Sequence, residues 1–171
     1  MTPAEERVDL VDEDDRVLGT VTRAEVRAGT LLHRGVAILV RDSAGRVYVH
    51  RRTADKDVFP SAYDMFVGGM VAAGEGYDAA AERELAEELG IRGGPLRPLF
   101  RHRYRGPDNN WHGAVYEVCW DGPVHPQASE IAWGTWLTLD ELRARMRRWA
   151  FVPDGTELFE RWLREQDDAR R

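Results

Sequence analysis

The chain has 171 residues, of which 43% are hydrophobic and 32% are charged, and its formal net charge is −6 at pH 7. This balance is typical of one folded domain and excludes a disordered chain. The net acidity argues against nonspecific binding to nucleic acid or membranes, the single cysteine excludes a disulfide framework, and no apolar run is long enough to span a membrane.

The N-terminal half of the sequence predicts strands and tight turns. VDLVD and VLGTVT flank an acidic turn at residues 13–15, which indicates a hairpin over residues 8–23. A second hairpin is predicted around Ser43-Ala44-Gly45. The elements expected next are a polar loop over residues 53–61, a short strand over residues 63–67 and a glycine-rich loop that opens at Gly68-Gly69.

The C-terminal half mixes helices with strands. Residues 77–89 are rich in Ala, Glu and Leu and predict a helix, with Gly90 suited to a left-handed cap. Thr138 and Glu141 form a capping box for a helix that ends near Trp149. The remaining expected elements are strands over residues 96–104, 111–120 and 131–137 and a last helix that starts at Pro153. Strands mixed with three helices predict an α/β or α+β layered fold.

Three carboxylates gather on one face of the predicted helix. Glu84, Glu87 and Glu88 stand at i, i+3 and i+4, where like charges repel, and the last turn of a helix disfavours anions. The cluster is therefore unfavourable unless it is simply solvated or binds a cation. A hard divalent cation such as Mg²⁺ would reverse both effects, because it takes carboxylate oxygens and substrate phosphates as ligands.

The spacing of the residues around this cluster favours a bound cation over a solvated acidic face. Gly69, Glu75, Arg83-Glu84-Leu85, Glu87-Glu88 and Gly90-Ile91 match every defining position of the Nudix box, so this segment resembles the Nudix hydrolases. The resemblance implies an α/β/α sandwich with a mixed central sheet. We expect one Nudix domain over residues 1–171, with residues 1–32 as an N-terminal hairpin extension and residues 153–171 as a C-terminal helix.

The resemblance also implies roles for individual residues. The ligands of Mg²⁺, or of Mn²⁺, would be Gly68, Glu84, Glu87 and Glu88, with the glycine contributing its carbonyl. Arg83 would orient the carboxylates, and Gly69, Glu75 and Gly90 would be structural. The implied reaction is attack of water on phosphorus, in which the metal neutralises phosphate charge and lowers the pKa of water.

The segment before the box is similar to the isopentenyl-diphosphate isomerase branch of the superfamily. Arg52 and Lys56 match a step that holds the diphosphate there, although a solvated basic loop would look the same. The isomerases place a catalytic cysteine and a metal-binding histidine where this chain has Val67 and Gly69. Cys119 lies in a later predicted strand, where we expect a small core residue, so the chemistry is predicted to be hydrolytic.

The identity of the general base is left open by the sequence. We assign catalysis to Arg83, Glu87, Glu88 and Glu130, with Glu88 as the first choice of base and Glu130 as the alternative. Glu117 is a further candidate to face the site. The residues expected to stack on a base or sugar, or else to pack in the core, are Phe66, Trp111 and His112.

The predicted function is metal-dependent hydrolysis of a nucleoside di- or triphosphate, a pyrophosphatase activity on a small nucleotide. The alternatives are an isopentenyl-diphosphate isomerase-like enzyme and a non-catalytic nucleotide-binding sensor. The N-terminal segment lacks a signal-peptide pattern, so we expect a cytoplasmic protein. The sequence leaves open whether it is a monomer or a homodimer, and which base or sugar it binds.

Overall fold

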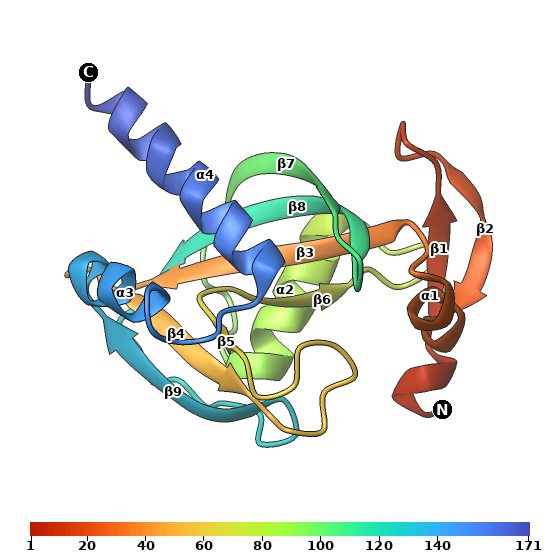
Figure 1. Cartoon of the computed structure of the whole chain (residues 1–171), viewed down its shortest axis with the longest axis horizontal. Helices are drawn as coiled ribbons and strands as arrows, with labels where there is room; N and C mark the ends of the chain where they lie inside the picture. Colours follow the sequence, from red (N-terminus) through yellow and green to blue (C-terminus); the bar gives the residue numbers. More distant parts are fainter.

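The structure, a computed structural model, describes residues 1–171 as a nine-stranded mixed sheet with helices on both faces (Figure 1). The strands are β1 (Arg7–Val11), β2 (Val17–Thr22), β3 (His33–Arg41), β4 (Val47–Arg52), β5 (Tyr63–Asp64), β6 (Val67–Met70), β7 (Arg97–Arg105), β8 (Asn110–Cys119) and β9 (Ile131–Leu137). The helices are α1 (Arg23–Gly29), α2 (Tyr77–Leu89), α3 (Leu139–Met146), α4 (Pro153–Ala169) and a short 3-10 turn, η1 (Pro3–Glu5). None of the helices combines the length and apolarity needed to cross a bilayer.

Strand β3 is the centre of the sheet. It pairs in parallel with β8 along its whole length and antiparallel with β6, while β4 pairs with β5 and β9. Its side chains alternate between the two faces, so Val36, Ile38 and Val40 belong to the core under α2. Ala37 and Leu39 belong to the core under α4. The result is the expected α/β/α sandwich, in which a strand buried on both faces reads as an apolar run.

Much of the local structure agrees with the sequence predictions. The first hairpin forms, α2 has the predicted bounds, and Gly90 adopts the left-handed cap with φ 67°. Leu85 and Ile91 pack in the same core cluster at this helix end. The capping box of α3 is present at Thr138 and Glu141, although the helix ends at Met146, before the predicted Trp149.

One prediction is right only in part, and three are wrong. The second hairpin forms its predicted turn, but β3 and β4 pair only at Arg41 and Val47, because β8 and β6 occupy the two edges of β3. Gly68 and Gly69 lie in β6 and do not open a loop. Helix α1 makes a fourth α-helix, started by a capping box between Thr22 and Glu25 that the sequence analysis missed. Cys119 is exposed at the end of β8 and is not a core residue.

Candidate functional site

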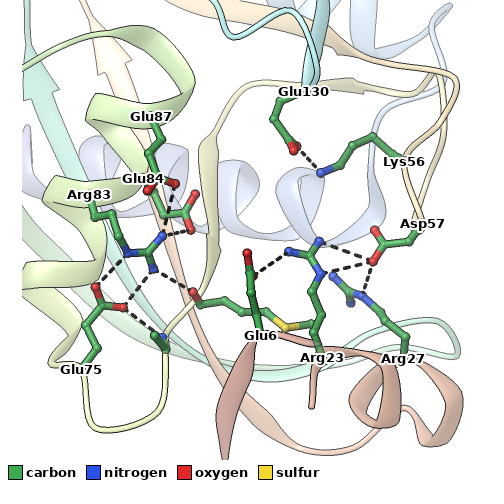
Figure 2. A network of polar contacts seen from close by, with 12 residues as sticks. Glu6, Arg23, Arg27, Lys56, Asp57, Glu75, Arg83, Glu84, Glu87 and Glu130 are labelled. Atoms are coloured by element: carbon green, nitrogen blue, oxygen red, sulfur yellow. Dashed lines mark hydrogen bonds and ion pairs between the residues drawn. The ribbon is translucent and has the colours of Figure 1, made fainter. Parts of the chain in front are cut away.

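Arg83 organises the acidic end of α2 (Figure 2). Its Nε and Nη2 donate to the two carboxylate oxygens of Glu75 at 2.9 Å each, and its Nη1 donates to Glu84 Oε1 at 2.8 Å. Nη2 also donates to the carbonyl oxygen of Met70 at 3.2 Å, which ties the helix to β6. The hydrogen bonds with Glu75 raise the pKa of Arg83 further, so this guanidinium stays charged.

Glu84 and Glu88 point inward from α2, whereas Glu87 does not. The Glu84 side chain is 13% exposed and Glu88 is 9% exposed, but the Glu87 side chain is 53% exposed and turns toward Arg83. Burial, and then the negative charges of Glu84 and Glu130, raise the pKa of Glu88 well above its ordinary value. Glu88 accepts no hydrogen bond that would offset this cost, so a positive charge beside it would be strongly favoured.

The two glycines of β6 allow close approach on both sides of the strand. A Cβ on Gly69 would lie 2.6 Å from Glu84 Oε1, so a side chain there would displace the carboxylate. A Cβ on Gly68, at φ 153°, would lie 2.0 Å from the carbonyl oxygen of Val36 in β3. Gly69 therefore lets Glu84 of α2 lie directly against β6, and Gly68 lets β6 lie directly against β3.

A cavity lies between α2 and the N-terminal helix, and its other side is basic. Glu88 and Gly68 line it together with four cationic side chains, which are Arg23, Arg27, Arg52 and Lys56. We call these four the basic side of the cavity. We call Glu84, Glu87 and Glu88 the acidic side, of which Glu88 lines the cavity itself. Figure 2 shows Glu84 and Glu87 across from Arg23, Arg27 and Lys56, with α1 carrying Arg23 and Arg27.

The arginines of α1 share one carboxylate. Arg23 Nε and Nη2 lie 3.4 Å from Asp57 Oδ2, and Arg27 Nε lies 3.0 Å from the same oxygen. Burial alone would raise the pKa of Asp57, but the two arginines lower it below its ordinary value. Arg27 also donates to Asn109 Oδ1 at 3.2 Å. Asp57 thus occupies donors that would otherwise face the cavity.

Lys56 and Glu130 join the loop after β4 to the loop before β9. The Lys56 ammonium forms an ion pair with the Glu130 carboxylate. The second loop is held on α2, because the amide of Gln127 donates to the carbonyl of Glu88 at 2.8 Å. Arg52 donates to the carbonyl of Val58 at 2.9 Å, within the first loop. Both loops are therefore anchored beside Glu88.

Of the predicted site residues, Arg52, Lys56, Gly68, Gly69 and Glu88 line this cavity, whereas Arg83, Glu84, Glu87 and Glu130 do not. No group of three or more His, Cys, Asp or Glu side chains lies close enough in this conformation to hold an ion. Glu117 was considered for the site, but it pairs with Arg41 and Arg97 away from the cavity. His112 contacts the carbonyl of Asp12, so it does not face the site either.

Phe66 and Trp111 do line the cavity, and both are buried. The Trp111 ring packs against Gly35 and Gly113, where a Cβ would lie 3.0 Å and 2.0 Å from ring atoms. The cavity residues that sequence reasoning missed are Arg23, Arg27, Asp64 and Asp154, together with Asp57 beside them. Only the spacing of Arg23 and Arg27, one turn apart on α1, offered a signal.

The donor set fits a hard divalent cation. The available oxygens are carboxylates and backbone carbonyls, which are ligands that Mg²⁺ accepts. Glu84 and Glu88 repel each other within a partly buried site, and the charges of Lys56 and Arg52 do not offset the burial that raises the pKa of Glu88. A cation between them and the carbonyl of Gly68 would remove that repulsion, with the basic side left to bind the phosphates.

Comparisons with known proteins agree with this geometry. The profile of the NUDIX domain matches residues 31–158. The chain belongs to the Nudix family. It is 52% identical to an uncharacterized Nudix hydrolase of Streptomyces coelicolor, covering 94% of this chain and 90% of that protein. It is 40% identical to one of Pseudomonas aeruginosa, over 92% and 94% of the two chains.

A solved structure supports the same fold. The crystal structure of a Deinococcus radiodurans protein superposes with a TM-score of 0.80 at 35% identity, covering 91% of this chain and 98% of that one. A MutT protein of Methanosarcina mazei gives a TM-score of 0.67 at 20% identity, which shows the fold alone. This Nudix protein therefore belongs to a family of hydrolases.

Proposed function

We propose that this Nudix protein hydrolyses nucleoside di- or triphosphates with Mg²⁺ or Mn²⁺. The observation that carries the proposal is the pairing, across one cavity, of an uncompensated buried glutamate with four cationic side chains. A phosphate chain bridged by a divalent cation needs both kinds of group, because its charge is neutralised from two directions.

Each side has a distinct role in the reaction. The metal would be held by Glu84, Glu88 and the carbonyl of Gly68, and by Glu87 once its side chain turns away from Arg83. When bound, it would neutralise phosphate charge and make water a better nucleophile. Arg83 would keep Glu84 in place through their 2.8 Å hydrogen bond. The four cations of the basic side would bind the non-bridging phosphate oxygens.

Glu88 is the favoured general base, and Glu130 is the alternative. The Glu88 carboxylate lines the cavity and has no hydrogen-bond partner, so it is free to take the proton of the attacking water. Glu130 is already paired with Lys56 and would first have to leave it. Nothing favours the isomerase alternative, because Val67 stands at the position of the isomerase cysteine and Cys119 is exposed elsewhere.

The test is a substrate screen with the purified protein. Ribo- and deoxyribonucleoside di- and triphosphates, dinucleotides and sugar nucleotides are incubated with Mg²⁺ or Mn²⁺, and the products are separated by chromatography. We expect cleavage of a nucleoside di- or triphosphate, and water labelled with heavy oxygen identifies the attacked phosphorus. Conversion of isopentenyl diphosphate, or binding of nucleotides without any cleavage, would contradict the proposal.

A further inference from the structure

Two carboxylates that the proposed reaction does not use line the same cavity. Asp64 ends strand β5, and Asp154 lies in the first turn of α4. Helix α4 approaches Asp64 so closely that a Cβ on Gly155 would lie 2.5 Å from Asp64 Oδ1. The two acidic side chains therefore meet where the sheet and the C-terminal helix pack together.

Asp154 is fixed by three hydrogen bonds. Its Oδ2 accepts from the indole Nε1 of Trp111 at 3.2 Å and from Asn109 Nδ2 at 3.1 Å. Its Oδ1 accepts from the amide of Gly155 at 3.0 Å. These donors, together with the positive end of the α4 dipole, stabilise the ionised carboxylate in one orientation.

Asp64 is not satisfied in the same way. Its Oδ1 accepts from the amide of Phe66 at 3.0 Å, but its Oδ2 has no partner in the protein. Burial, and then the charge of Asp154, raise the pKa of Asp64 to about 7. An oxygen that faces a cavity next to a second carboxylate is a strong acceptor for an N–H or O–H group of a ligand.

His50 gives a second, independent indication of a ligand. It stands opposite Asp64 in the β4–β5 ladder, so the two side chains share a face of the sheet. It is 2% exposed and lines the same cavity, yet its Nδ1 has no hydrogen-bond partner. Buried polar atoms are nearly always paired, so an unpaired ring nitrogen here indicates a missing polar group.

We propose that Asp64, Asp154 and His50 bind the part of the substrate that is joined to the diphosphate, and that they select a group carrying hydrogen-bond donors. The inference rests on the proposed function and assigns its specificity. Two carboxylates repel phosphate, whereas the basic side attracts it, so the cavity orients the substrate end to end. An amino-substituted nucleobase or a ribose diol supplies such donors, and Phe66 adds an apolar surface beside them.

Binding of matched nucleotide pairs tests the proposal without any need for turnover. The probes are the α,β-methylene analogues of CDP and UDP, and of ADP and inosine diphosphate, each with its 2′-deoxy counterpart. Within each pair an exocyclic amino group replaces a carbonyl and an acceptor ring nitrogen replaces a ring N–H, and the deoxy forms remove one hydroxyl. Affinities are measured by calorimetry with Mg²⁺ for the wild type, for Asp64→Asn and for Asp55→Asn, an exposed carboxylate with no role in the cavity.

We expect the wild type to bind the amino member of a pair about tenfold more tightly, because a site built to accept N–H rejects a carbonyl. Asp64→Asn, whose amide both donates and accepts, should bring this ratio close to one, while Asp55→Asn should keep it. If the ribose-to-deoxyribose ratio collapses in Asp64→Asn and the base ratio does not, the diol is the group recognised. Asp154→Asn should also reduce the ratio, which guards against an effect of folding in one variant.

Three outcomes would overturn the inference. They are equal binding of all probes, no binding of any probe, and affinity ratios that stay unchanged in both Asp64→Asn and Asp154→Asn. These outcomes are separable from the proposed function. Cleavage of nucleotides without selectivity would keep the hydrolase and remove the recognition site. Selective binding by the wild type that Asp64→Asn abolishes, with no cleavage of any nucleotide, would keep the recognition site and remove the hydrolase.

Discussion

The acidic and basic sides of the cavity are built in opposite ways. The acidic side comes from one helix, and Arg83 holds it through short hydrogen bonds to Glu75 and Glu84. The basic side is gathered from α1, the end of β4 and the following loop, and its contacts with Asp57 are longer. We infer that the acidic side holds the reacting groups in position, whereas the basic side exchanges its contacts with Asp57 for contacts with the substrate.

The largest effect is expected on the acidic side. Glu88→Gln should lower kcat about 10³-fold, because the amide cannot take a proton and is a poorer metal ligand. The same change should stabilise the metal-free fold by roughly 1–2 kcal/mol, because it removes a buried charge that has no partner. Turnover is measured with Mg²⁺, and thermal unfolding is measured in a chelator.

Glu87→Gln is the matched control for stability. Its side chain is 53% exposed, so the same chemical change should alter the free energy of unfolding by less than about 0.5 kcal/mol. A kcat close to that of the wild type in Glu88→Gln would move the role of base to Glu130. No gain in stability would mean that the Glu88 charge is compensated in solution.

His33 lines the cavity between the acidic and basic sides, and we expect its ring to stay uncharged in the folded protein. Burial lowers the pKa of His33 to about 4 from an ordinary value of 6.5. Between these values the unfolded chain binds a proton there and the folded chain does not, so stability falls as the pH falls. His33 should therefore make the free energy of unfolding about 2 kcal/mol lower at pH 5 than at pH 8.

His33→Asn should remove that cost, because an amide nitrogen can replace Nδ1 beside the carbonyl of Leu31 and does not titrate. The wild type and His33→Asn are unfolded in urea at pH 5 and at pH 8. The quantity compared is the difference in their free energies of unfolding at each pH. His125→Asn, at an exposed position, serves as the control. A difference that does not change with pH would show that His33 is accessible to protons in the folded state.

The same contrast explains what the sequence could predict. Helix α2, its cap at Gly90 and the Glu75–Arg83 spacing depend on residues close together in the chain, so local rules suffice for them. The partners of β3 could not be deduced, because its two edges are taken by strands from distant segments. A central strand buried on both faces carries no alternation that would identify its neighbours.

The basic side and the aspartates were missed for a related reason. Arg23 and Arg27 lie outside the segment that matches the NUDIX domain, and only the packing of α1 brings them to the cavity. Asp64 and Asp154 are far apart in the sequence and meet through the approach of Gly155. Residue types alone do not show which charged side chains from distant segments will share a cavity.

On the basic side we expect an effect on binding rather than on chemistry. Arg27→Gln should raise KM for the nucleotide about tenfold and change kcat by less than about threefold, because the contact is made equally in the ground and transition states. Arg16→Gln, with a side chain that is 75% exposed, should leave both constants unchanged. Steady-state kinetics measure both constants. A fall in kcat at unchanged KM would show that Arg27 stabilises the transition state instead.

The smallest expected effect is a decrease in KM, caused by removing the charge of Asp57. Asp57 Oδ2 accepts from both Arg23 and Arg27, so its carboxylate competes with a phosphate for the same donors. Asp57→Asn keeps an acceptor oxygen that can hold the arginines in place but removes the competing charge, so KM should fall about threefold. The fall should shrink as salt is added, since it comes from charges near the surface.

Asp55→Asn changes the net charge equally from the same loop and should leave KM unchanged if the effect is local. A rise of KM in Asp57→Asn would instead show that the negative charge is needed to hold the arginines in position for the phosphate. The sign of one kinetic constant therefore distinguishes a competitor that substrate displaces from a fixed support. Only the first agrees with a basic side that exchanges partners while the acidic side stays rigid.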